Sequence, residues 1–259
     1  MNILGIILLL LLLYIIWRIL YYLFANPYTL QTLQSGQTAS TVAASSLASS
    51  NGVSSTNFAY SIWFYINDWN YRYGEPKVIF GRMGSKGESN DVSGNSSSIS
   101  GLNPCPSVVL GAIENNITVA LSCYPGTNNT DIQPSTSGSG SNFVVHNCNV
   151  SNVPIQKWVN MVLSVYGRTL DLYIDGKLVR TCLLPGTANI NNDADVYVTP
   201  QGGFDGWTSK FQYYPNSLNP QEVWNIYSQG YGGQSWFNNA YSVQVSLLEN
   251  GTQQGSFTL

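Results

Sequence analysis

The chain has 259 residues, of which only 9% are charged, and its formal net charge at pH 7 is −3. Soluble domains usually carry about 25% charged residues, so neutral polar and aromatic side chains make up an unusually large share of this chain. Its ten lysine and arginine residues form no basic cluster along the sequence. Nucleic acid is therefore excluded as an expected partner, because its recognition depends on clustered positive charge.

An apolar segment from Ile3 to Ala25 follows the first two residues. A helix that crosses a bilayer needs about 20 apolar residues, and this segment is long enough if one arginine within it extends towards the headgroups. We expect residues 1–26 to form a single-pass membrane anchor with the lipid bilayer as partner. A cleaved signal peptide is the alternative, but the basic residues that normally precede its apolar core are missing here. The residues expected near the membrane interface are Trp17, Arg18, Tyr21 and Tyr22.

Residues 27–56 contain no charge and are rich in Ser, Thr, Gln and Ala, which predicts an extended, polar stalk. From residue 57 onwards the sequence changes to short apolar segments separated by turn residues, which predicts strands. Asp175-Gly176 is typical of a tight hairpin turn. One helix is expected from Asn219 to Tyr227, with Asn219 as its N-cap and Pro220 in its first turn. The expected strands are 58–66, 77–80, 107–110, 117–121, 158–166, 169–174 and 177–182.

Many short strands with few helices indicate a β-sandwich of two antiparallel sheets. The C-terminal extension, residues 232–259, contains a strand-like segment at 241–247. Asn250-Gly251 is expected to turn it into a second strand that ends at Phe257, giving a β-hairpin. This hairpin would pair with the sheet edge of a neighbouring protein or cover an edge of its own domain.

The chain has four cysteines, and none lies in a C-x-x-C pair that would indicate a zinc site. Cys105 and Cys123 flank an expected hairpin near residues 114–116, so we predict a Cys105–Cys123 disulfide, which leaves Cys148 to pair with Cys182. Four buried free thiols are the alternative, because the compartment is unknown. Sequons of the type N-x-S/T, which would allow N-glycosylation in a secretory route, begin at Asn95, Asn116, Asn128, Asn149 and Asn250.

Four sequence blocks occur in an order that resembles laminin-G-like, concanavalin-A-like domains. They are Ser61–Trp69, Lys157–Met161, Asp171–Lys177, and Gly202–Gly206 followed by Phe211 and the expected helix. The resemblance implies a jelly roll over residues 57–231, in which Trp63, Trp69 and Trp158 fill the core. Some members of this family bind Ca²⁺ through carboxylates at the rim, and the candidates here are Asp193, Asp195 and Asp205. A polar turn is the alternative for these residues, and no other cofactor is expected.

No set of catalytic residues is apparent. Glycoside hydrolases of this fold superfamily use carboxylates closely spaced on one strand, whereas the five glutamates of this chain are widely separated in sequence. The single histidine, His146, lacks the G-x-S-x-G context of a serine hydrolase. We therefore expect a non-enzymatic protein.

Two functions are expected. An anchor, a neutral stalk and such a domain also resemble minor virion proteins of large icosahedral double-stranded DNA viruses. That resemblance implies a structural capsid protein that tethers a bilayer to a protein shell, with capsid or other assembly proteins as partners and the virion as its location. The alternative is a membrane-anchored lectin or adhesin at a cell surface that binds glycans. Its expected carbohydrate or partner contacts are Tyr71, Tyr73, Trp207, Tyr213, Tyr214 and Trp236.

Overall fold

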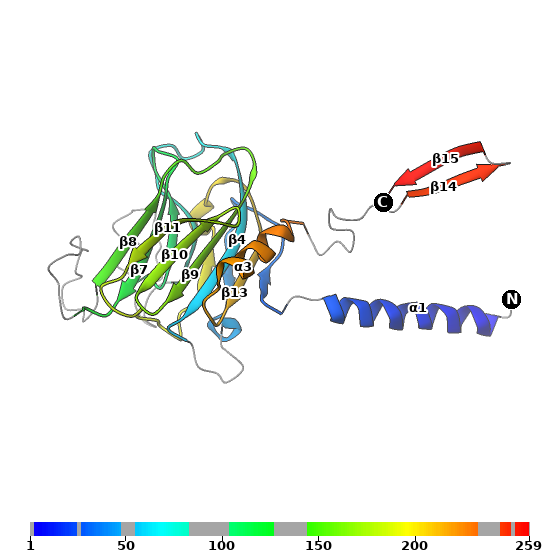
Figure 1. Ribbon diagram of the computed structural model, residues 1–259, viewed down its shortest axis with the longest axis horizontal. Coiled ribbons are helices and arrows are strands. Elements are labelled where there is room, and N and C mark those ends of the chain that lie inside the picture. Colours follow the sequence, from blue (N-terminus) through cyan, green and yellow to red (C-terminus); the bar gives the residue numbers. More distant parts are fainter. Residues whose placement is uncertain are drawn as a thin grey trace. The chain divides into compact units, whose positions relative to one another are not determined.

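The computed structural model describes residues 3–24, 27–47, 55–82, 104–126, 144–232, 244–249 and 252–258. The chain divides into two compact units, one made of residues 1–28 and 234–259 and the other of residues Thr29–Gly233. The second unit contains the β-sandwich (Figure 1).

The described residues of the first unit form one helix and one small sheet. Helix α1 spans Ile3–Phe24, and its side chains are described at Gly5 and from Ile7 to Arg18. Strands β14 (Gln244–Glu249) and β15 (Thr252–Thr258) form a two-stranded antiparallel sheet, in the segment where the sequence predicts a hairpin.

The expected single-pass membrane localisation is contradicted. Within the described residues, no helix combines the length and the apolar content that crossing a bilayer requires. Trp17 and Arg18 lie exposed on α1, and the side chains of Tyr21 and Tyr22 lie outside the described residues.

The larger sheet of the sandwich has seven strands, and its order is β1-β13-β4-β9-β10-β11 with β2 also pairing with β13. Long strands that are buried along most of their length form its centre, where β4 and β9 pair from Phe58↔Val165 to Tyr65↔Trp158. Its strands are β1 (Thr29–Gln31), β2 (Gln34–Ser35), β4 (Phe58–Asp68), β9 (Trp158–Tyr166), β10 (Thr169–Ile174), β11 (Lys177–Leu183) and β13 (Asp205–Tyr214).

The smaller sheet has six strands in the order β3-β12-β5-β6-β7-β8. Both sheets are antiparallel, so the fold is mainly β and consists of two antiparallel sheets, as the sequence indicates. The strands of this sheet are β3 (Ser40–Val42), β5 (Lys77–Arg82), β6 (Ser107–Leu110), β7 (Ile117–Cys123), β8 (Val144–Val150) and β12 (Val196–Val198).

A single hydrophobic core lies between the two sheets. Phe64 of β4 and Leu163 of β9 belong to the same buried cluster as Val108 and Leu121 of the smaller sheet. The ring of Tyr60 lies 5.4 Å from that of Phe80 and 5.8 Å from that of Phe211, centroid to centroid. Burial of these apolar groups stabilises the fold by about 25 cal/mol per Å² removed from water.

Residues expected in the polar stalk belong instead to the sandwich. β1 and β2 pair with β13, and β3 pairs with β12. The short helix η1 (Ala44–Leu47) follows and buries Leu47 completely. The physical reason is that these short strands satisfy backbone groups along β12 and β13, which would otherwise be open sheet edges.

Helix α3 (Pro220–Ser228) lies on the outer face of the larger sheet (Figure 1). Asn219 and Glu222 form a reciprocal capping box at its start, as the expected N-cap predicts. Val223 packs against Val162 and Tyr173.

One disulfide, Cys148–Cys182, joins β8 to β11 with a Cα–Cα distance of 6.1 Å. These strands are the edges of the two sheets, so the bond closes one side of the sandwich. Cys105 and Cys123 are free and buried. The structure therefore has the second of the two expected disulfides but not the first. Burial raises the pKa of the Cys123 thiol to about 12, which keeps it protonated and unreactive.

Candidate binding pocket at one end of the sandwich

Three connections meet at one end of the β-sandwich. Residues 69–76 join β4 to β5, residues 111–116 join β6 to β7, and residues 151–157 join β8 to β9. Because successive strands of this fold run antiparallel, these alternate connections lie at the same end of the two sheets.

A pocket with a volume of about 480 Å³ opens between these connections. Its apolar part includes Ile113 and Ile155, which are 62% and 43% exposed. Its polar part consists mainly of side-chain amides, which both donate and accept hydrogen bonds. The lining residues are Trp69, Ile113, Glu114, Asn115, Asn116, Ser151, Asn152 and Ile155.

Trp69 is the aromatic residue of this pocket. Its indole Nε1 donates a hydrogen bond to the carbonyl oxygen of Ile113 at 3.0 Å, so the polar edge of the ring is satisfied by the neighbouring connection. The Nζ atom of Lys77 lies 4.9 Å from the ring centroid, in a cation–π contact. Lys77 is 1% exposed, and burial together with the nearby Arg72 charge lowers its pKa.

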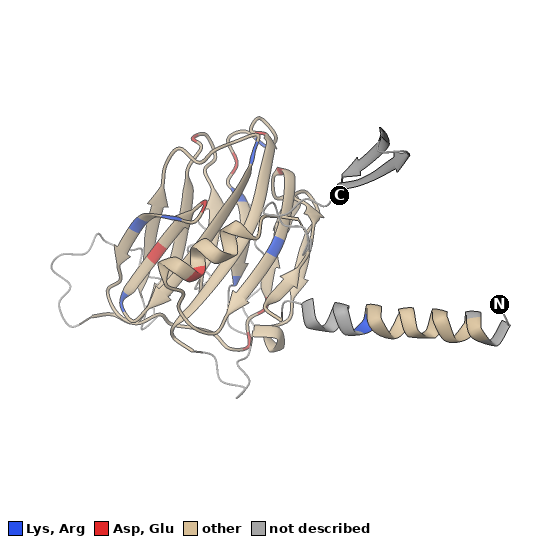
Figure 2. Cartoon of the chain, turned by 45° about the vertical axis from the view of Figure 1, so that its right-hand side comes forward, with Lys and Arg blue, Asp and Glu red and all other residues tan. Residues whose placement is uncertain are grey.

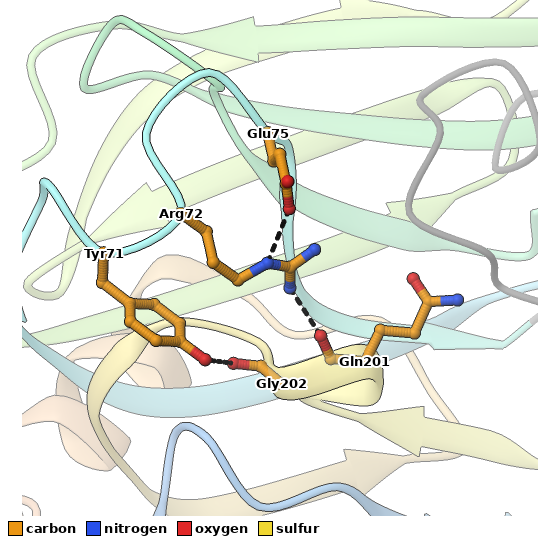
Figure 3. Close-up of polar contacts among 5 residues, drawn as sticks. All are labelled: Tyr71, Arg72, Glu75, Gln201 and Gly202. Atoms are coloured by element: carbon orange, nitrogen blue, oxygen red, sulfur yellow. Dashed lines mark hydrogen bonds and ion pairs between the residues drawn. The ribbon is translucent and has the colours of Figure 1, made fainter.

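The connection that carries Trp69 is anchored on both sides. Figure 3 shows the hydroxyl of Tyr71 donating to the carbonyl oxygen of Gly202 at 3.0 Å. Nη1 of Arg72 donates to the carbonyl oxygen of Gln201 at 2.5 Å, and its Nε forms an ion pair with Glu75 at 2.8 Å (Figure 3). On the side of the pocket, the amide of Gly74 donates to the carbonyl oxygen of Ala112 at 3.0 Å.

The other two connections are joined through Asn115. The amide of Val153 donates to the carbonyl oxygen of Asn115 at 2.9 Å, and Nδ2 of Asn115 donates to the carbonyl oxygen of Val153 at 3.3 Å. The amide of Gln156 donates to the carbonyl oxygen of Ile66 at 2.8 Å, which ties the third connection to β4. All three connections are thus held together by hydrogen bonds, and the pocket is pre-formed.

The pocket carries little charge. Glu114 is the one ionisable residue that lines it, and its Oε2 accepts a weak hydrogen bond from Nδ2 of Asn116 at 3.4 Å. Charged residues elsewhere on the described part of the sandwich are few, as Figure 2 shows along the chain. The pocket is therefore suited to a small, mostly neutral ligand with both apolar and hydroxyl or amide groups.

The expected contact residues that the structure describes are not gathered at one site. Tyr73 is 58% exposed, whereas Tyr213 is 4% exposed and lies in the core, so its ring is not presented to a ligand. Tyr71 anchors its loop through Gly202. Tyr214 is partly buried and its hydroxyl contacts Oε1 of Gln212 at 3.2 Å. Trp236 lies outside the described residues.

Trp207 is the expected contact residue with the clearest aromatic surroundings. It is 49% exposed and lies opposite Tyr65 on the adjacent strand β4. The ring of Tyr65 is 5.8 Å from that of Trp158, which in turn stacks on Tyr231 at 4.4 Å. This row covers the outer face of the larger sheet beside α3.

The three aspartates expected to bind Ca²⁺ have separate structural roles. Asp195 accepts a hydrogen bond from the amide of Ala44 at 2.8 Å. Asp205 accepts hydrogen bonds from Gln37 at 2.9 Å and Asn67 at 2.8 Å. Asp193 lies in a turn, where its amide donates to Asn191 Oδ1 at 3.0 Å. In the described ranges, no group of three or more Asp, Glu, His or Cys side chains could hold a metal ion.

Sequence reasoning assigned Trp69 to the core and residues 114–116 to a hairpin turn, and it did not identify the pocket. Trp69 does pack against the core cluster, but it is only partly buried and the rest of it lines the pocket. The signal that could have found the site is the recurrence of asparagine in two separate connections at the same end of the expected sandwich.

No protein-family model matches the chain, and no curated protein matches it. Similar solved structures include the botulinum neurotoxin serotype D binding domain, with 13% identity and a TM-score of 0.44 over 67% of this chain and 37% of that chain. The binding domain of botulinum neurotoxin serotype D/C is similar with 15% identity and a TM-score of 0.44, over 70% of this chain and 37% of that one. The binding domain of botulinum neurotoxin DC, solved in complex with SialylT, has 16% identity and a TM-score of 0.45, over 70% and 36% of the two chains. The chain thus spans well under half the length of each of these proteins.

Proposed function

We propose that the β-sandwich is a carbohydrate-binding module and that the pocket around Trp69 receives a sugar ring. The observation that carries this proposal is the combination of an indole, two exposed isoleucines and three asparagine amides in one pocket of about 480 Å³. A pyranose ring presents apolar C–H groups on its faces and hydroxyl groups at its edge. Aromatic and aliphatic groups suit the former, and amides that donate and accept suit the latter.

The rigidity of the pocket supports the same function. Bonds from Trp69 to Ile113 and between Asn115 and Val153 hold the three connections in place before a ligand arrives. A pre-formed site loses less conformational freedom on binding, and this preserves affinity for a small ligand. The sequence resemblance to concanavalin-A-like domains is consistent with this assignment.

The proposed role is binding without catalysis. Glycoside hydrolysis needs two carboxyl groups on either side of the scissile bond, and Glu114 is the one carboxylate among the residues lining the pocket. The structural capsid protein, which is the first of the two functions expected from the sequence, has no comparable feature among the described residues to support it.

A glycan array probed with the full chain and two matched variants tests this proposal. Trp69→Ala removes the aromatic surface of the pocket, whereas Trp207→Ala removes a half-exposed indole from the outer face of the larger sheet. We expect the wild type and Trp207→Ala to bind the same glycans and Trp69→Ala to bind them at least about tenfold more weakly, a change of about 1.4 kcal/mol. Silence of the folded wild-type protein on the array contradicts the function. Loss of binding in Trp207→Ala alone would indicate that the glycan binds on the outer face of the larger sheet.

A further inference from the structure

A second cavity adjoins the Trp69 pocket. Its volume is about 320 Å³, and Ser151 and Asn152 line both cavities. It lies where β8 and β11 form the neighbouring edges of the two sheets, close to the Cys148–Cys182 disulfide. The two cavities are therefore neighbours, and residues 151 and 152 lie at the boundary between them.

The second cavity contains a positive charge that the first lacks. Arg180 lines it together with Val150, Ile174 and Val179, and no carboxylate is among its lining residues. Nη1 of Arg180 donates to the carbonyl oxygen of Asn149 at 2.8 Å, so the guanidinium is held across the gap between the two sheet edges. The two ion pairs within the described part of the chain are Arg72–Glu75 and Lys157–Asp175, and neither involves Arg180.

A guanidinium group presents five N–H donors in a plane and pairs with a carboxylate through two parallel hydrogen bonds. Asn149 accepts a hydrogen bond from one of these donors, and the Arg180 side chain is otherwise exposed to solvent. A cation that lines a cavity and has no carboxylate among its neighbours there favours an anionic group on the ligand.

We propose that the two cavities form one site for an acidic oligosaccharide, with a neutral sugar in the Trp69 pocket and a carboxylate-bearing sugar beside Arg180. This inference rests on the function proposed above and names the class of glycan that the site takes. The oligosaccharide would pass over residues 151 and 152 between these two sugars.

The pKa of a histidine in this protein responds to the charge of Arg180. His146 is the single histidine of the protein, and its pKa is lowered by burial and by the positive charge of Arg180. A carboxylate that neutralises Arg180 is expected to raise the pKa of His146 towards its ordinary value, whereas a neutral sugar in the Trp69 pocket leaves it unchanged.

The test compares neutral oligosaccharides that the protein binds with counterparts whose terminal CH₂OH group is oxidised to a carboxylate. We expect the wild type to bind the acidic member of a pair at least tenfold more tightly. Arg180→Gln should abolish this preference and keep the affinity for the neutral member, and Arg180→Lys should restore part of it. Lys177→Gln is the matched control, because it removes a positive charge from the same strand without touching the cavity.

Titration of His146 by NMR gives a second readout that does not depend on affinity. The acidic ligand should raise the pKa of His146 in the wild type but not in Arg180→Gln. Equal affinity for both members of each pair, or an unchanged preference in Arg180→Gln, overturns the inference while carbohydrate binding stands. Binding of neither member by folded wild-type protein overturns the proposed function itself.

Discussion

Nε1 of Trp69 donates a hydrogen bond to the carbonyl oxygen of Ile113 at 3.0 Å, and this bond joins the β4–β5 connection to the β6–β7 turn. The same residue packs against the hydrophobic core and lines the candidate pocket. Trp69 therefore contributes to stability and also lies in the proposed binding site, and different substitutions test these two roles separately.

Trp69→Phe keeps an aromatic ring but removes the donor to Ile113. We expect the free energy of unfolding to fall by about 1 kcal/mol, the usual net value of one hydrogen bond, in addition to the loss from the smaller ring. Chemical denaturation measures this change. Trp207→Phe is the control and should change stability by less than about 0.5 kcal/mol, because its side chain is half-exposed. Equal losses in the two variants would show that the Ile113 bond contributes nothing.

Asn115→Ala removes the side-chain bond to Val153 and leaves the backbone bond between the same residues in place. We expect a loss of about 1 kcal/mol and faster hydrogen exchange of the Val153 amide, because the two connections then separate more easily. Ser151→Ala, which also changes the pocket lining but not this link, should leave the exchange rate of Val153 unaltered. Unchanged protection in Asn115→Ala would show that the pocket is held by other contacts.

The buried ammonium group of Lys77 should make the stability of the protein depend on pH. Burial lowers the pKa of Lys77 in the folded state. Between that lowered pKa and the unfolded value of about 10.4, the unfolded chain therefore binds more protons than the folded protein. Stability contributed by this residue therefore rises with pH in that window, and the cost of the buried charge is fully present below it. Lys77→Met lacks this cost, so its stability relative to the wild type should decrease as the pH rises from 7 to about 10. Thermal melts across this range measure the difference.

Lys177→Met provides the control for this experiment, because Lys177 is exposed on β11. Its stability relative to the wild type should stay nearly constant over the same range of pH. A constant difference for Lys77→Met as well would show that the Lys77 ammonium is not destabilised in the folded protein.

The disulfide between Cys148 and Cys182 closes a loop with a sequence separation of 34. By the chain-entropy relation, its removal in Cys148→Ser/Cys182→Ser should lower the free energy of unfolding by about 4 kcal/mol. Thiol alkylation followed by mass spectrometry checks the pairing independently. Unfolding without a reductant should expose two thiols, at Cys105 and Cys123, and unfolding with a reductant should expose four. Alkylation of Cys123 in the folded protein would contradict its burial.

Local sequence patterns predicted helix α3 and seven strands of the sandwich, namely β4, β5, β6, β7, β9, β10 and β11, but not β8, β12 or β13. Asp175 and Gly176 both have positive φ in the turn between β10 and β11, as the Asp-Gly sequence predicts. The capping box of α3 likewise depends on residues only three positions apart. The short strands between residues 29 and 42 were not predicted, because only their pairing with distant β12 and β13 makes them strands.

The sequence by itself determined the mainly β architecture, because alternating apolar residues and turn residues act over a few positions. Only the tertiary structure assembled the candidate pocket. Trp69, Asn115 and Asn152 lie on three separate connections, and antiparallel pairing over long sequence separations brings them to one end of the sandwich. The packing of the two sheets, whose edges are β8 and β11, places Cys148 beside Cys182 and leaves Cys105 and Cys123 as free, buried thiols. A sequence pattern records the preference of each segment, whereas a binding pocket depends on which segments become neighbours.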